Sequence, residues 1–301
     1  MAEHSHIEWT DATWTTITGC SRVSPGCVNC YAERLTATRL AHKPKYAGLA
    51  RMTKSGPRWT NEIRLHPDGL FKPLRWKRPR MIFVNSMSDT FHEKVPFEFL
   101  DKLFAVMALC PQHTFQVLTK RPERMAEYLN GVGLIGEQYG RTNRIIWGAE
   151  TFASDAWDKA EHFYLPLPNV WLGTSVENQE EADRRISHLL KCPAAVRFLS
   201  CEPLLGPIDL VDFLRPKAGD LGWTSGILGV RVCHELLKDR LQEHWVIVGG
   251  ESGPGKRPMD LAWARSIRDQ CKAAGVPFFC KQIDKVQPIP DDLMIREWPH
   301  A

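Results

Sequence analysis

The sequence predicts an α/β fold, and within that class an incomplete parallel (β/α) barrel of about six to seven strands. Short apolar runs rich in β-branched and aromatic residues recur along the chain, and each run ends in polar residues. Continuous runs such as MIFV and WVIV are typical of strands buried on both faces, as in parallel sheets. Amphipathic helical patterns separate the runs, and this alternation indicates βαβ units.

The expected elements alternate in order along the chain. Apolar residues at a period of 3.6 identify the helices. The expected helices cover residues 32–42, 96–109, 179–191 and 261–274. The expected strands lie within residues 13–18, 80–89, 113–121, 169–178, 196–205, 245–253 and 277–282.

The chain of 301 residues is expected to form a single barrel domain, residues 1–301. Three stretches, at about 43–80, 131–168 and 216–244, do not fit the strand–helix alternation and are interpreted as insertions. The last two are longer than usual connections within a barrel. They could equally be lids or substrate-binding elements, and the sequence does not choose between these.

The composition and the first residues indicate a cytoplasmic protein without membrane contact. No apolar run approaches the roughly 18 residues that span a bilayer, and MAEHSHIEWTD is not a secretory signal. In a reducing compartment, the nine cysteines are expected to be buried, metal-binding or catalytic rather than disulfide-bonded. Six occur singly and are expected to be buried thiols: Cys110, Cys192, Cys201, Cys233, Cys271 and Cys280.

The other three cysteines form a compact motif. Cys20, Cys27 and Cys30 have the spacing Cys-x6-Cys-x2-Cys, between the first expected strand and the expected helix 32–42. Cys27 and Cys30 would lie in the loop and the first turn of that helix, where amides and the helix dipole favour the thiolate. Thiolate is the form of cysteine that binds metal, so the motif predicts a metal site.

Three ligands leave the identity of the metal open. A structural zinc site takes four ligands, and the sequence has no second Cys-x2-Cys, although His4, His6 or a distant cysteine could complete one. A catalytic zinc with three protein ligands would also fit. A [4Fe–4S] cluster held by three cysteines would keep one iron free for a substrate or cofactor.

A cysteine triplet after the first strand of an α/β barrel resembles the radical S-adenosylmethionine (SAM) superfamily. The usual spacing there is Cys-x3-Cys-x2-Cys, and this chain departs from it in the first gap. The chain looks like a phage- and bacteria-associated three-Cys-motif family of unknown function, which is distantly similar to spore photoproduct lyase. The matching segments are TWTTITGCSRVSPGCVNCYAER, RMTKSGPRWT, IFVNSMSDTFHE, HTFQVLTKRPERM, NVWLGTSVEN, RFLSCEPLLGPI and WVIVGGESGPGKRPM.

This resemblance implies that Cys20, Cys27 and Cys30 bind a [4Fe–4S] cluster. A reduced cluster of this kind donates an electron to bound SAM, giving methionine and a 5′-deoxyadenosyl radical that removes hydrogen from a substrate. An electron donor such as flavodoxin or ferredoxin would be required. The similarity to a DNA-repair enzyme favours a nucleobase or nucleic acid as the substrate, in a modification or repair reaction.

SAM-binding residues are expected at the carboxyl ends of the strands, where functional groups collect in parallel barrels. Acceptors there suit the SAM amino group, cations suit its carboxylate and hydrogen-bonding groups suit its ribose. Glycines with an adjacent acceptor could form a backbone shelf for adenine or substrate. In each case the alternative is a structural role in helix capping, loop fixing or a tight turn. The candidates, in strand order, are Ser86, Ser88, Asp89, Lys120, Arg121, Ser175, Glu177, Asn178, Glu202, Gly249, Gly250 and Glu251.

The charge distribution suggests a partner. Residues 43–80 hold eleven Lys/Arg against two acids, together with Trp59 and Trp76. Cations neutralise phosphates and aromatic faces stack on bases, which favours a nucleic acid or nucleotide substrate. The alternative is a solvated surface loop. The oligomeric state and the residue that acts on the substrate are not indicated.

Two other functions remain open from the residues alone. One is a zinc-stabilised nucleic-acid-binding protein without catalysis. The other is a zinc-dependent hydrolase, with Glu202 or Glu251 as general base.

Overall fold

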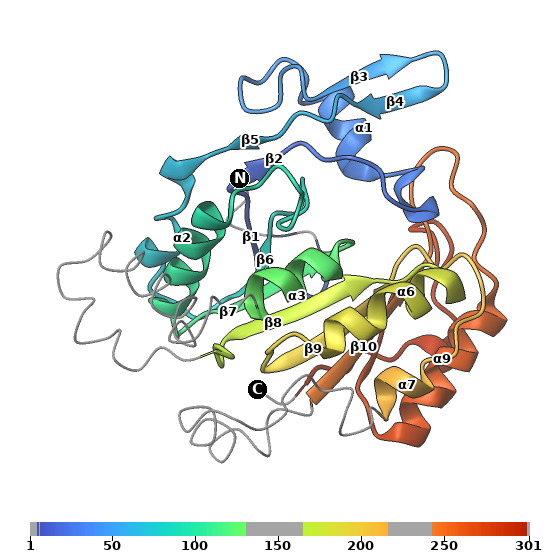
Figure 1. The fold of residues 1–301 in the computed structure, drawn as a ribbon. Coiled ribbons are helices and arrows are strands. Elements are labelled where there is room, and N and C mark those ends of the chain that lie inside the picture. Colours follow the sequence, from blue (N-terminus) through green and yellow to red (C-terminus); the bar gives the residue numbers. More distant parts are fainter. Residues whose placement is uncertain (1–4, 6, 131–164, 216–242, 300–301) are drawn as a thin grey trace.

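The computed structural model describes residues 5, 7–130, 165–215 and 243–299. Its centre is a seven-stranded sheet with the order β1-β6-β7-β8-β9-β10-β11, in which all neighbours are parallel. The sheet curls into a half-barrel (Figure 1), which confirms the predicted incomplete (β/α) barrel. The strands are β1 (Ala12–Trp14), β6 (Met81–Val84), β7 (Thr114–Thr119), β8 (Val170–Ser175), β9 (Val196–Cys201), β10 (Glu243–Gly249) and β11 (Phe278–Gln282).

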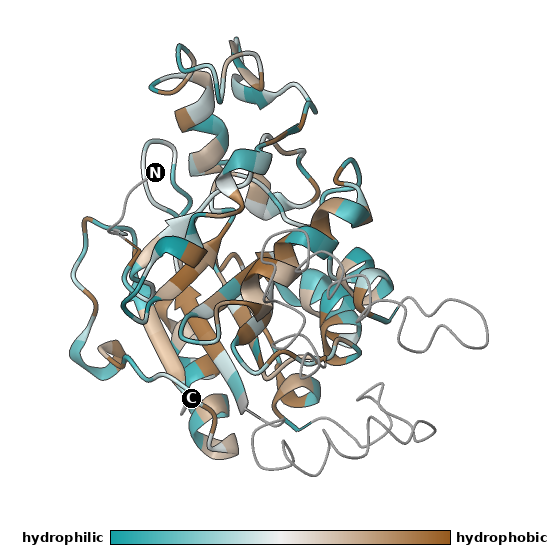
Figure 2. Cartoon of the chain, turned by 90° about the vertical axis from the view of Figure 1, so that its left-hand side faces the viewer, coloured by the Kyte–Doolittle hydropathy of each residue, from teal (hydrophilic) through white to brown (hydrophobic). Residues whose placement is uncertain are grey.

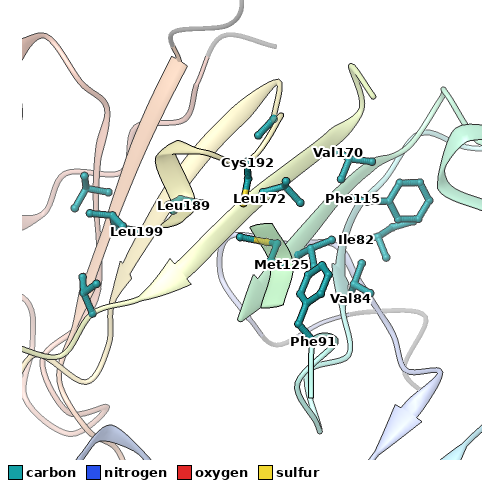
Figure 3. Packing of buried hydrophobic residues seen from close by; sticks show 14 of the residues in the cluster. Ile82, Val84, Phe91, Phe115, Met125, Val170, Leu172, Leu189, Cys192 and Leu199 are labelled. Carbon is teal, nitrogen blue, oxygen red and sulfur yellow. The ribbon is translucent and has the colours of Figure 1, made fainter. Parts of the chain in front are cut away.

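Helices cover the outer face of this sheet (Figure 1). The main core lies between the two layers, and Figure 3 shows Met125 and Leu189 packed near Leu172 of the sheet. In Figure 2 the hydrophobic residues gather on the strands and on the helix faces turned toward them. These helices are α2 (Phe97–Ala108), α3 (Pro122–Asn130), α6 (Gln179–Leu190), α7 (Val211–Leu214) and α9 (Leu261–Ala274).

The inner face of the sheet holds a second, aromatic core. Trp9 enters it from the N-terminal segment and lies 4.9 Å from Phe83 and 6.1 Å from Trp245, measured between ring centroids. Trp171, Phe198, Ile247 and Phe279 belong to the same cluster. The interior of the half-barrel is therefore filled with side chains, and these support whatever lies at its mouth.

The prediction of a single first strand over residues 13–18 is wrong in its extent. Only β1 joins the large sheet, whereas β2 (Ile17–Thr18) pairs antiparallel with β5 (Arg64–Leu65). The reason is Asn85, whose side-chain oxygen accepts hydrogen bonds from the backbone N–H groups of Thr16 (2.8 Å) and Ile17 (3.1 Å). These bonds turn the chain away from the sheet immediately after β1.

The expected helix 32–42 is also shorter in the structure. Helix α1 (Tyr31–Ala37) ends there, and the chain continues in turns to residue 49. It lies over the barrel mouth, beside the hairpin of β3 (Ala50–Thr53) and β4 (Gly56–Trp59) (Figure 1). The short 3-10 turns are η1 (Pro25–Cys27), η2 (Pro67–Gly69), η3 (Pro73–Arg75) and η4 (Asp291–Leu293).

The insertion at 43–80 is structured and is joined to the rest of the barrel through the pairing of β5 with β2. Trp76 is 7% exposed and belongs to the main core. Trp59, the last residue of β4, is 9% exposed and packs in a small cluster with Ala32 of α1. Trp76 is therefore a core residue, whereas Trp59 also lines the cavity at the barrel mouth. Stacking of a base on this segment stays a prediction. Most of the predicted insertions at 131–168 and 216–244 lies outside the described residues.

The five singly occurring cysteines in the described ranges are buried free thiols, as expected, whereas Cys233 lies outside those ranges. No helix that the structure describes has the length and apolar character needed to cross a bilayer.

Candidate cofactor site

A cavity of about 520 Å³ opens at the carboxyl ends of the strands. Cys20, Cys27 and Cys30 all line it, and its apolar side is formed by Trp9 and Phe83 of the inner core. The parallel sheet explains this convergence, because all its strands end at the same edge. Nine of the candidate residues also line the cavity: Ser86, Ser88, Asp89, Lys120, Arg121, Ser175, Glu202, Gly250 and Glu251.

The segment 20–30, which we call the cysteine loop, crosses this mouth. Cys27 ends η1, Cys30 is the residue before α1, and all three thiols are free and half-buried. Burial raises the pKa of Cys20 to about 12, with a further contribution from the nearby Asp89 carboxylate. Burial also raises the pKa of Cys30 despite amide hydrogen bonds from α1. A bound cation would favour the thiolate form of Cys20 and Cys30 against this effect of burial.

Glu177, which follows β8, anchors the middle of the cysteine loop. Its Oε1 accepts a hydrogen bond from the Ser24 hydroxyl at 2.8 Å and lies 3.0 Å from Lys120 Nζ, while its Oε2 lies 2.8 Å from Arg185 Nη1. Burial alone raises the pKa of the Glu177 carboxyl, but Lys120 and Arg185 outweigh it and lower the pKa. A Cβ on Gly26 would lie 2.2 Å from Glu177 Oε1, so the loop approaches this carboxylate closely.

Arg121, after β7, anchors the start of the loop. Its guanidinium donates to Ser21 Oγ at 2.6 Å and to Cys20 Sγ at 3.9 Å. It also forms ion pairs with Asp89 at 3.1 Å and Glu93 at 2.9 Å. Arg121 thus connects a strand end directly to the first cysteine.

The Asp89 carboxylate is fully engaged by the protein. Besides Arg121, it accepts hydrogen bonds from the Thr119 hydroxyl (2.6 Å) and from the backbone N–H groups of Lys120 (3.0 Å) and Phe91 (2.9 Å). Asp89 therefore stabilises the ends of β6 and β7 against each other.

Glu251, after β10, anchors the end of the loop. It accepts a hydrogen bond from Asn29 Nδ2 at 2.8 Å and forms an ion pair with Arg257. Arg257 in turn donates to the backbone carbonyl of Pro25 at 2.9 Å. Three strand ends, those of β7, β8 and β10, therefore each hold a different part of the cysteine loop.

The glycine motif after β10 is explained largely by packing. A Cβ on Gly250 would lie 2.1 Å from the backbone oxygen of Ile283, so only glycine allows the two chains to approach this closely. Asn178 is a helix cap, because its side chain accepts a hydrogen bond from Glu181 N at 3.0 Å. Glu177, Asn178 and Gly249 do not line the cavity, and ligand binding by the candidate residues stays a prediction.

The lining of the cavity also contains an ion pair that includes Lys281, a residue that was not singled out from the sequence. Lys281 Nζ lies 2.6 and 2.8 Å from the two carboxylate oxygens of Glu202. Lys281 is the next-to-last residue of β11. It could have been found by searching the carboxyl end of the seventh predicted strand, as was done for the other strands. Within the described ranges, the hydroxyls of Ser86, Ser175 and Ser200 line the cavity without a protein hydrogen-bond partner.

The loop residues Ser21, Ser24 and Asn29 were also missed. They lie between the cysteines, and no periodicity or spacing distinguishes an anchoring serine from a solvated one. Among the described residues, no three His, Cys, Asp or Glu side chains gather closely enough to coordinate one metal ion. A four-iron cluster makes a different demand, because each of its three cysteines binds a separate iron.

The fold and the site together define an α/β protein with an incomplete parallel barrel and a three-cysteine loop across its mouth. The chain belongs to the DUF5131 family, described as a protein of unknown function, which it matches over residues 4–292.

The other comparisons add little. No curated protein sequence matches the chain. Among solved structures, S-formylglutathione hydrolase from Staphylococcus aureus is similar with a TM-score of 0.18 and 9% identity, over 48% of this chain and 56% of that chain. A similarity at this level carries no argument about fold or function.

Proposed function

We propose that this protein is a radical SAM enzyme, which binds a [4Fe–4S] cluster through Cys20, Cys27 and Cys30. The observation that carries the proposal is that all three cysteines line a single cavity at the barrel mouth. When bound, the reduced cluster supplies the electron that cleaves SAM to methionine and a 5′-deoxyadenosyl radical. The protein's own residues position the reactants and exclude water.

The donor set fits such a cluster. Three free thiols on one loop supply three ligands, and cysteine is the usual ligand of iron–sulfur clusters. Burial raises the pKa of the Cys20 and Cys30 thiols, so the positively charged iron core of a cluster would supply the charge that deprotonates them. The loop is held in place by contacts with Arg121, Glu177 and Glu251.

The cavity also fits a cofactor of the size of SAM. Its volume of about 520 Å³ lies within the range of small-molecule sites. The unpartnered hydroxyls of Ser86 and Ser175 are available to a ligand's amino group or ribose. Because Asp89, Arg121 and Glu177 are engaged in holding the loop and strand ends, we assign them to positioning rather than to direct ligand contact.

The contacts favour this function over a zinc hydrolase. A general base needs a carboxylate that is free to take a proton from water. Glu202 is bound by Lys281, and Glu251 is bound by Arg257 and Asn29. Neither carboxylate is therefore poised as a base.

For the substrate, we propose a nucleic acid or nucleotide, with an electron carrier such as flavodoxin or ferredoxin as partner and a cytoplasmic location. Exposed cations on the insertion support a phosphate-bearing substrate. Arg51 and Lys54 are exposed on the β3–β4 hairpin, and Trp59 of the same hairpin lines the cavity. A polyanion on the hairpin would therefore lie next to the mouth.

The test is 5′-deoxyadenosine formation, measured by chromatography with dithionite as reductant. Reconstituted wild type should form this product slowly, and faster when DNA or a nucleotide is added. The Cys27→Ala variant should form none. No product from protein with an intact cluster would reject SAM cleavage, and product unaffected by any nucleic acid or nucleotide would reject the substrate class.

A further inference from the structure

Arg34 is an unusual cation at the cavity mouth. It lies on α1, one turn after Cys30, and its half-buried side chain lines the cavity. Within the part of the chain that the structure describes, its guanidinium has no hydrogen bond and no ion pair. A partly buried cation without a partner is costly and needs an explanation.

The other half-buried cations on the cavity wall do have partners. Lys120 pairs with Glu177, and Lys281 pairs with Glu202. Arg121, by comparison, contacts two carboxylates. Because these cations are neutralised by the protein, they offer little charge to a ligand, whereas the charge of Arg34 is available.

The surroundings of Arg34 restrict its position. A Cβ on Gly253, whose φ is +93°, would lie 2.3 Å from the Arg34 guanidinium, so this group packs against the backbone after β10. Ser252 and Lys285 line the same cavity, and neither side chain has a partner within the described residues. One guanidinium, one ammonium and one hydroxyl therefore line the same cavity, and the guanidinium lies beside Gly253, the residue that follows Ser252.

We propose that Arg34, Lys285 and Ser252 form an oxyanion subsite that binds a phosphate group of the substrate. A guanidinium binds phosphate through two parallel hydrogen bonds, and two cations match a phosphate dianion better than a single carboxylate. The subsite deepens the proposed function and rests on it for the identity of the substrate. Its position beside α1 would hold a nucleotide's phosphate at the rim, with the base directed into the cavity.

Equilibrium binding to the full chain tests this before any iron is added, so the result does not depend on cluster formation. The ligands are the four deoxynucleoside 5′-monophosphates and the matching nucleosides. Wild type should bind the monophosphates more tightly than the nucleosides. We call the ratio of the affinity for a monophosphate to that for the matching nucleoside the phosphate advantage. Arg34→Gln should reduce the phosphate advantage at least about tenfold, and Lys285→Gln should reduce it less.

The matched control is Arg39→Gln, which removes an exposed arginine just after α1. Its phosphate advantage should equal that of wild type. If Arg34→Gln does not fold, Lys285→Gln decides the question, because Lys285 is exposed. Equal binding of monophosphates and nucleosides by wild type would overturn the proposal.

A second binding measurement, with SAM as the ligand, distinguishes a substrate phosphate from the SAM carboxylate as the anion that Arg34 binds. Binding of SAM to wild type and to Arg34→Gln is measured under the same conditions. Weaker binding of the monophosphates alone supports the substrate subsite. Weaker binding of SAM alone would mean that Arg34 holds the SAM carboxylate, and this would overturn the assignment to phosphate.

Discussion

The Glu177 carboxylate accepts a hydrogen bond from the Ser24 hydroxyl at 2.8 Å and so joins the end of β8 to the middle of the cysteine loop. Ser24 and Gly26 lie in the long gap between Cys20 and Cys27. This gap gives the chain enough length to descend onto Glu177 and return to Cys27. The unusual spacing of the motif thus has a structural explanation in the contact with β8.

Replacing Glu177 by Gln should strongly destabilise the fold. The substitution leaves the buried Arg185 with only its ion pair to Glu181 and removes the partner of Lys120. Loss of one member of a buried ion pair costs about 3 kcal/mol or more in the free energy of unfolding. Urea denaturation measures the effect, with the exposed Glu180→Gln as control, for which we expect less than about 0.5 kcal/mol. Equal stability of the two variants would contradict the anchoring role.

Gly26→Ala should disturb the loop without removing any ligand. The new Cβ would overlap Glu177 Oε1, so the loop must move away from β8. We expect reduced iron binding per chain after reconstitution. The control is Gly69→Ala, where a Cβ meets nothing closer than 3.7 Å. Full iron binding by Gly26→Ala would show that the close contact is not required.

More of the fold than of the site could be predicted from the sequence. Strands such as β8 and β10 contain continuous apolar runs, Val170–Leu172 and Trp245–Val248, because both of their faces are buried, and this leaves a clear pattern. The break after β1 left no such pattern, because it depends on hydrogen bonds from the distant Asn85 side chain.

For the site, the expectation that functional groups collect at the carboxyl ends of parallel strands located the right region. It did not reveal the roles of the residues there. Glu177 and Arg121 lie at strand ends as expected, yet both reach into the cysteine loop. Their partners Ser24 and Ser21 are 153 and 100 residues away in sequence. Such contacts depend on the folded geometry, so only the structure could reveal that these groups hold the loop.

His92 should make the stability depend on pH. Its Nδ1 accepts a hydrogen bond from Lys94 N, so the neutral ring donates from Nε2 to Ser21 Oγ at 2.9 Å. Burial, followed by the nearby Arg121, lowers the pKa of His92 from 6.5 to about 4. Its contribution to stability is therefore complete above about pH 6.5 and is lost as the pH falls toward 4, by at most about 1.4 kcal/mol per pH unit.

Urea denaturation of wild type and His92→Gln between pH 4 and 8 measures this contribution. The stability difference between the two proteins should shrink as the pH falls below about 6.5. The exposed His42→Gln serves as control. A difference that stays constant over the whole range would rule out the titration of His92.

Arg121→Gln should lower the reduction potential of the bound cluster. The guanidinium donates to Cys20 Sγ at 3.9 Å, and hydrogen bonds and positive charge near a cysteine sulfur stabilise the reduced cluster. A redox titration followed by electron paramagnetic resonance measures the potential. Arg121→Lys should give a smaller decrease, and the exposed Arg184→Gln none. A potential unchanged in Arg121→Gln would exclude this role.

The iron content after anaerobic reconstitution tests the central claim most directly. We expect about four irons per chain in wild type. We expect no cluster when Cys20, Cys27 or Cys30 is replaced by Ala, and full content when the buried Cys110 or Cys192 is replaced. One zinc per chain with no uptake of iron would contradict the claim that the cysteine loop holds an iron–sulfur cluster.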